Sequence, residues 1–123
     1  MHTQLSKNFN SKEFDSPDIK FSGKNISLDL IVKLQSLRDL YKKPIVIISG
    51  VRSKQHNLKI GGVPNSAHVI FQAADIKVNN SHDRFLLLKL ALQVGFNRIG
   101  INKNSLHLDV SKSGPQNVIW DYY

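Results

Sequence analysis

The chain contains no cysteine, so it forms no disulfide bond and cannot bind a metal through thiolates. A metal site would have to use His, Asp or Glu, and glutamate occurs only once, at Glu13. Long apolar runs are also missing, because no segment reaches the roughly 20 residues of a membrane-spanning helix. Residues 1–14 contain no apolar core of a secretory signal. We therefore expect synthesis in the cytoplasm without a signal peptide, and no insertion into a membrane.

Acidic residues are few relative to basic ones. Seventeen Lys and Arg face nine Asp and Glu, which gives a net charge of +8 and a pI near 9.9. Such a charge favours a polyanionic partner: a nucleic acid, an anionic membrane or a bacterial cell wall. The basic residues are scattered with few aromatic residues among them, which argues against a groove that binds nucleic acid. The alternative is a surface charge that only keeps the protein soluble.

The length of 123 residues predicts one domain over residues 1–123. Apolar periodicity and capping residues predict the secondary structure. The expected elements are an arm over residues 1–26 that packs on the core, a helix from its cap Ser27 to about Lys42, a buried strand over 45–49, an irregular segment over 51–68, a strand over 72–78, a helix from its cap Ser81 to Gly95, and strands over 97–101, 105–110 and 117–123. This order predicts an α+β fold, in which helices pack on one face of a mainly antiparallel sheet.

Two histidines lie close to aspartates at predicted strands. His68 precedes Asp75 by seven residues, and His107 and Asp109 share one face of the strand "LHLDV" because strand side chains alternate. Two imidazoles and one carboxylate with an open fourth position are the usual ligand set of catalytic zinc, and His68, Asp75 and His107 could supply it. Spacing alone leaves open that these are hydrogen-bonded structural residues.

A longer pattern connects these residues. A strand ends in "SGVRS", an Asn follows the Arg by five residues, and a Gly-Gly turn, "SAH" with an Asp seven residues later, and "LHLDV" complete the series. This pattern resembles the zinc D-alanyl-D-alanine carboxypeptidase family, which also contains phage L-alanyl-D-glutamate endopeptidases that cut peptidoglycan. The opening "LSKNFNSKEFDS" is also similar, so the likeness covers nearly the whole chain. The resemblance implies the D-Ala-D-Ala carboxypeptidase (hedgehog-like) fold.

The resemblance also implies roles for individual residues. His68, Asp75 and His107 would bind Zn²⁺, and Arg52 would hold a carboxylate or carbonyl of the peptide stem. Ser66 matches a position beside the metal that helps to place the substrate, although it could equally be a turn serine that bonds its own backbone.

The chain departs from the family pattern at the general base. Relatives carry Glu three residues before the last ligand His or His two residues before it, where this chain has Asn104 and Ser105. Asp109 is the nearest remaining carboxylate, and it would either shuttle protons or accept a hydrogen bond from a ligand. Relatives also often carry Gly where this chain has Phe71, which predicts a bulkier wall of the cleft.

These observations predict a monomeric zinc peptidase that acts on peptidoglycan stem peptides, encoded by a phage or prophage, and virion-associated or released at lysis. One alternative is a zinc-containing module that binds the wall or a protein and has lost its general base. Another is a basic nucleic-acid-binding domain, which would retain DNA or RNA in a salt-sensitive manner unaffected by a chelator. Nothing in the motif region favours this last alternative, and we expect no nucleic-acid partner.

Overall fold

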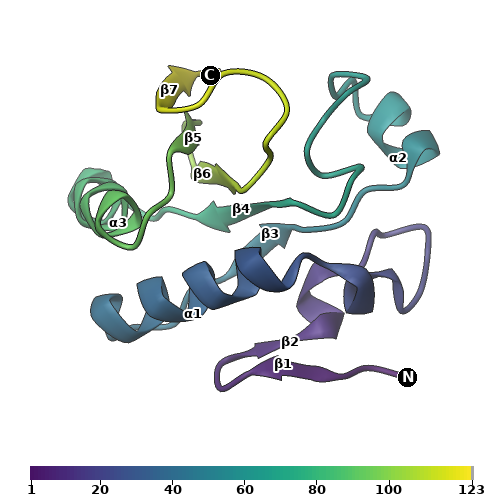
Figure 1. Cartoon of the computed structure of the whole chain (residues 1–123), viewed down its shortest axis with the longest axis horizontal. Coiled ribbons are helices and arrows are strands. Elements are labelled where there is room, and N and C mark those ends of the chain that lie inside the picture. Colours follow the sequence, from purple (N-terminus) through teal and green to yellow (C-terminus); the bar gives the residue numbers. More distant parts are fainter. Residues whose placement is uncertain (123) are drawn as a thin grey trace.

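A computed structural model describes residues 1–122 of the chain (Figure 1). Its main sheet has five strands in the order β3-β4-β6-β5-β7, and β1 and β2 form a separate two-stranded ribbon. The strands are β1 (Gln4–Ser6), β2 (Phe9–Asn10), β3 (Ile47–Ser49), β4 (Ala73–Lys77), β5 (Arg98–Ile101), β6 (Ser105–Asp109) and β7 (Val118–Asp121); the α-helices are α1 (Leu28–Tyr41), α2 (Lys54–Lys59) and α3 (Ser81–Gln93); the 3-10 helices are η1 (Ser11–Phe14) and η2 (Ser22–Asn25). The fold is α+β, as expected. Tyr123, the last residue of the predicted strand 117–123, lies outside the described residues.

The main sheet is mixed, where the sequence predicted a mainly antiparallel one. The pairs β3–β4, β4–β6 and β5–β6 are antiparallel, whereas β7 runs parallel to β5. The parallel pairing arises because the hairpin returns the chain along β6 and the loop over residues 110–117 then carries it back to the start of β5. The whole connection from β5 to β7 covers residues 102–117, which is long enough to join two parallel strands.

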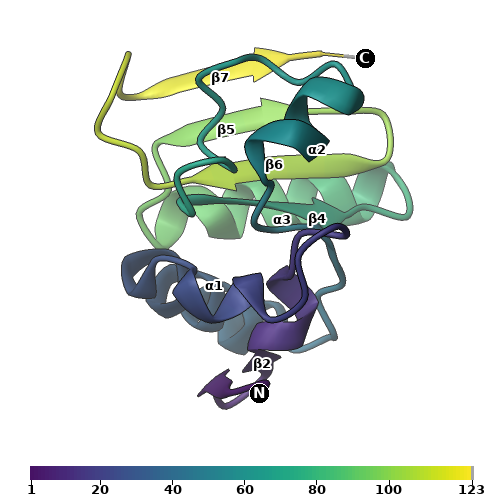
Figure 2. The same cartoon turned by 90° about the vertical axis from the view of Figure 1, so that its right-hand side faces the viewer.

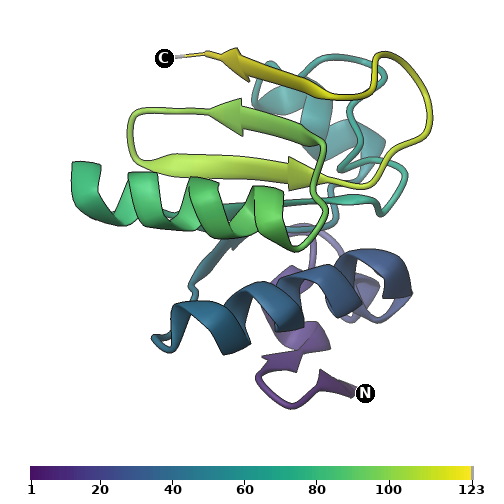
Figure 3. The same cartoon turned by 60° about the vertical axis from the view of Figure 1, so that its left-hand side comes forward.

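The α-helices do not all pack on one face of the sheet, although the sequence predicted this: α1 and α3 cover one face, and α2 lies on the other. α1 and α3 run side by side in front of the strands in Figure 3, whereas Figure 2 shows α2 in front of the sheet and α3 behind it. The covered face carries the apolar residues of β4 and β6, among them Ala74, Ile76, Leu106 and Leu108, all fully buried. Because side chains alternate along a strand, Asp75 and His107 point to the face of α2.

Capping and apolar spacing explain α1. Ser27 accepts a hydrogen bond from the backbone N–H of Leu30, as an N-cap residue does, and Lys42 ends the helix in the left-handed conformation with φ 62°. Leu34 and Leu37 are fully buried, so their face of the helix packs into the core. Burial of one such leucine contributes about 1.5–3 kcal/mol.

The arm over residues 1–26 contributes large side chains to the same core. Phe9 and Phe14 are essentially inaccessible to solvent and belong to the main apolar cluster. The backbone N–H of Val51 donates to the carbonyl of Phe14 over 2.8 Å, which ties the arm to the segment that follows β3.

Two details differ from the expectation. The strand at 45–49 is an edge strand rather than a buried one, because β3 pairs only with β4 and leaves Val46 and Ile48 more than half exposed. The N-cap of α3 is Asn80 rather than Ser81, since the Asn80 side chain accepts from the N–H of Asp83. Gly95, with φ 101°, follows the end of α3 as predicted.

Candidate metal centre

Three segments bring the predicted ligands together. Asp75 and His107 are directly paired across β4 and β6, so their side chains are neighbours on one face of the sheet. His68 comes from the loop before β4. That loop is held in place by hydrogen bonds from Arg52 N–H to the His68 carbonyl and from His68 N–H to Ser66 Oγ, both 3.2 Å long. The His68 side chain is 2% exposed.

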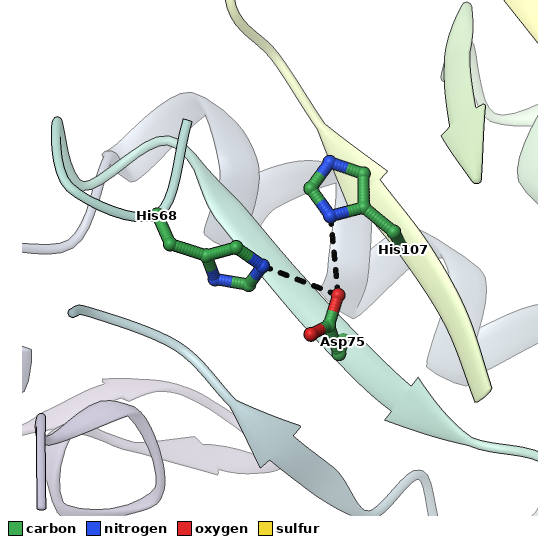
Figure 4. Close-up of side chains that lie close together, drawn as sticks. All are labelled: His68, Asp75 and His107. Carbon is green, nitrogen blue, oxygen red and sulfur yellow. Dashed lines mark hydrogen bonds and ion pairs between the residues drawn. The ribbon is translucent and has the colours of Figure 1, made fainter. Parts of the chain in front are cut away.

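The donor atoms of these residues converge on one point. His68 Nε2 lies 3.2 Å and His107 Nδ1 3.1 Å from the same oxygen, Asp75 Oδ1. Figure 4 shows both imidazole rings directed at this carboxylate. One ligand atom from each of the three residues lies within 4.8 Å of the others, so the group could hold a single metal ion.

The hydrogen bonds on the outer side of each ring fix the tautomers. His68 Nδ1 lies 2.7 Å from the Gly50 carbonyl oxygen, which can only accept, so this nitrogen carries the proton. His107 Nε2 lies 2.6 Å from Asp109 Oδ2 and donates to it. Without a metal, a proton on an inward nitrogen forms the hydrogen bond to Asp75 Oδ1. Loss of that proton leaves a neutral ring whose inward nitrogen has a free lone pair for a metal ion, because the outer nitrogen keeps its own proton. Histidines that bind zinc usually donate their second ring N–H to a carbonyl or carboxylate oxygen, as both of these histidines do.

The charges of the centre are strongly coupled. Burial acts to raise the pKa of Asp75, but hydrogen bonds from His107 and His68 outweigh it and hold this pKa far below its usual range. Burial acts to lower the pKa of His107, but its bonds to Asp109 and Asp75 raise it above its ordinary value. The centre thus stabilises positive charge between its carboxylates, and a divalent cation would supply that charge and displace the ring proton.

Arg52 lies behind Asp75. Its Nη2 donates to Asp75 Oδ2 over 3.2 Å, while Nε and Nη1 donate to Ser49 Oγ and Asn57 Oδ1, each over 3.3 Å. Five N–H groups belong to a guanidinium, so two remain for another ligand. The structure therefore places Arg52 against a predicted metal ligand, a contact that spacing did not indicate.

The Gly-Gly turn has a structural reason that involves Asn57. Gly61 adopts φ 77°, which favours glycine, and a Cβ at Gly62 would lie only 2.1 Å from Asn57 Oδ1. The Asn57 amide also donates to the Val63 carbonyl over 2.8 Å. The turn therefore supports the asparagine that holds Arg52.

Ser66 and Asp109 both hold the histidine ligands from outside. Ser66 is 7% exposed, and its hydroxyl accepts the His68 N–H described above, as in a turn. The Asp109 side chain is fully buried on the far side of His107 from Asp75. It accepts from Arg98 Nε over 2.7 Å and from the Ser111 N–H over 3.0 Å, in addition to His107. These three hydrogen bonds fix the position of the carboxylate.

Two residues of this neighbourhood were not found from the sequence. Gly100 pairs with both His107 and Trp120, which places the Trp120 indole beside the His107 ring with centroids 5.5 Å apart. Arg98, the partner of Asp109, also stacks near this indole, with its Cζ 5.5 Å from the ring centroid. Alternation along β5 puts Arg98 on the face of Gly100, but the sequence does not reveal which strands are neighbours.

Tyr122 is the third such residue, and it lies beside the centre just after β7. Its ring packs over Gly100, where a Cβ would be 2.8 Å from Tyr122 Cε1. Burial raises the pKa of the Tyr122 hydroxyl, the charge of Asp75 raises it further, and hydrogen bonds with Asn102 and Ser105 oppose the rise. The phenol is therefore a neutral hydrogen-bond donor at neutral pH, close to one of the two positions where the family's general base is missing.

The fold and this group of donors define an α+β protein with a candidate centre for one divalent metal ion. The family model described as Peptidase M15 matches residues 4–111. The chain therefore belongs to the peptidase M15 family, which confirms the resemblance and implies hydrolase activity with zinc as the cofactor. A search of the curated proteins gave no match. Among residues 1–122, no helix is long and apolar enough to cross a membrane.

Proposed function

We propose that the protein is a zinc-dependent peptidase that cleaves the peptide stems of bacterial peptidoglycan, as a D,D-carboxypeptidase or an L,D-endopeptidase. The observation that carries this proposal is the convergence of His68 Nε2 and His107 Nδ1 on Asp75 Oδ1, with the opposite nitrogen of each ring already bonded. Family membership supports the reaction class. The proposal includes the hedgehog-like fold, a single monomeric domain and a role in wall lysis or remodelling by a phage or prophage.

Zinc, when bound, would polarise the scissile carbonyl and acidify a water molecule. The residues of the chain would bind the ion and orient its ligands. His68, Asp75 and His107 hold the ion, while Asp109 orients His107 and Arg52 orients Asp75. Ser66 keeps the His68 loop in position.

Substrate contacts would come from two other side chains. The free N–H groups of Arg52 are suited to a carboxylate or carbonyl of the stem peptide. The Tyr122 hydroxyl would donate a hydrogen bond to the substrate oxygen on which negative charge develops, because the Tyr122 ring packs over Gly100, the cross-strand neighbour of His107. A donor of this kind supports catalysis where a strong general base is missing.

Replacement of Tyr122 by Phe tests this last role. We expect kcat to fall about a hundredfold, as for the loss of one oxyanion donor. Zinc stoichiometry and the melting temperature should not change, because the ring that covers Gly100 is retained. The Tyr41→Phe variant is the control, since it removes a hydroxyl from the buried face of α1. Equal activity of the two variants would exclude Tyr122 from the reaction.

Digestion of purified muropeptides, with mass analysis of the fragments, tests the proposed function itself. We expect zinc-loaded protein to release new fragments and a chelator to stop the release. The fragment masses show whether a terminal D-alanine or an internal stem bond is cut. Binding of zinc without any turnover would instead support the non-catalytic wall-binding module. The engagement of Asp109 with three protein groups is the observation that favours this second candidate.

A further inference from the structure

A cavity of about 790 Å³ adjoins the metal centre on the side of Arg52. Its walls come from three segments: the arm over residues 19–25, residues 51–55 at the start of α2, and the loop over residues 69–71. Arg52 belongs both to this wall and to the centre, where it bonds Asp75 Oδ2. The cavity is therefore connected to the centre through Arg52, although His68, Asp75 and His107 do not line it.

The charge of the cavity wall is entirely positive. Lys20, Lys24 and Lys54 line it together with Arg52, and no Asp or Glu is among its described lining residues. The three lysines form no ion pair with any residue in the described part of the chain. The nearest carboxylate in sequence, Asp18, accepts over 2.5 Å from the hydroxyls of Ser16 and of Ser53, which lines the cavity, so it offsets part of this positive charge. The excess of positive charge gives the cavity a potential that attracts anions.

The uncharged part of the wall contains both polar and apolar side chains, and the apolar ones include two phenylalanines in an unusual conformation. Phe21 and Phe71 have φ of 67° and 65°, a left-handed region that disfavours side chains with a Cβ. At Phe71 the backbone is fixed by hydrogen bonds of its N–H to the His68 carbonyl and of its carbonyl to the Ser27 N–H. Glycine would suit this conformation better. The ring is nevertheless present and 38% exposed, which fits a binding role better than a packing role.

We propose that this cavity binds the carboxylate-bearing part of an acidic peptide, with the lysines and Arg52 on its carboxylates and the two phenylalanine rings against its apolar atoms. The inference rests on the proposed function and deepens it, because it assigns the acidic part of the stem to the Arg52 side of the metal centre. A concave cavity with apolar as well as cationic side chains suits a short peptide better than an extended polyanion.

The test measures binding to chelated protein, so that no cleavage occurs. The probe is a synthetic L-Ala-γ-D-Glu-L-Lys peptide, compared with the same peptide in which the glutamate α-carboxylate is an amide. We expect the amide to bind about tenfold more weakly, because each charge-assisted hydrogen bond contributes on this scale. The Lys20→Gln/Lys24→Gln double variant should bind the acidic peptide about tenfold more weakly than the parent does, and its binding of the amide peptide should not change.

Two further variants make the result specific. Lys89→Gln/Lys103→Gln carries the same charge change at exposed sites outside the cavity and should bind like the parent. Phe71→Gly removes the ring and suits the backbone conformation, so we expect cooperative melting with about fivefold weaker binding.

Either of two results would overturn the cavity proposal. The first is that the parent and both cavity variants bind the acidic peptide equally well. The second is that the cavity and control lysine variants lose the same affinity for this peptide, while the parent binds polyphosphate as tightly as the peptide. These outcomes are distinct from failure of the proposed function. Muropeptide cleavage with unchanged peptide binding in the variants would reject the cavity alone. Cavity-dependent binding of the acidic peptide without any cleavage by zinc-loaded protein would reject the peptidase alone.

Discussion

Replacement of His107 by Ala is expected to abolish both stoichiometric zinc binding and the cleavage of peptidoglycan. The substitution removes one of three donors that converge on a single point, and the two that remain cannot hold the ion in a hydrolytic site. It also deprives Asp109 of one partner, although Arg98 still neutralises that carboxylate. Metal content of the purified protein and release of fragments from cell walls are the two measurements.

His82→Ala is the matched control for this experiment. His82 is an exposed residue in the first turn of α3, outside the group that could hold a metal. The control should keep both zinc and activity. Undiminished lysis by His107→Ala would refute the zinc mechanism, and loss of both properties in His82→Ala would point to a general loss of folded protein.

Replacement of Asp109 by Asn is expected to weaken zinc binding about 10- to 100-fold, as for other groups that orient a metal ligand from behind. Asn keeps the shape but loses the charge that orients and polarises the His107 ring. It also leaves Arg98 without its carboxylate partner in a largely buried place, which should lower the free energy of unfolding by about 3 kcal/mol. Asp121→Asn, at an exposed position of β7, is the control with the same change of charge.

Titration with zinc separates the two roles that the sequence left open for Asp109. If the residue positions His107, cleavage by the variant recovers once zinc is saturating. If it is the proton shuttle, kcat stays low at any zinc concentration. We expect recovery, because the Asp109 side chain is fully buried and bonded to His107, Arg98 and the Ser111 N–H.

Short-range features of the fold were predictable from contiguous residues. The N-cap at Ser27, the apolar spacing of α1 and the glycine after α3 depend on hydrogen bonds and burial within a few positions of the chain. The identity of the α3 cap was wrong by one residue, since Asn80 and Ser81 are both good caps and only the backbone conformation selects between them. The burial of β3 was also wrong, because an apolar run does not reveal that a strand lies at the edge of a sheet.

For the candidate site, the sequence alone determined the residue types and their alternation: two histidines and an aspartate at strands, with Asp109 on the face of His107. Only the tertiary structure shows which of these residues contact one another. Asp75 pairs with His107, and Arg52 bonds Asp75. Arg98 bonds Asp109, and the Tyr122 ring packs over Gly100. These contacts join residues up to 32 positions apart and depend on strand order, which is set by long-range packing and leaves no periodic signal in any short stretch of sequence.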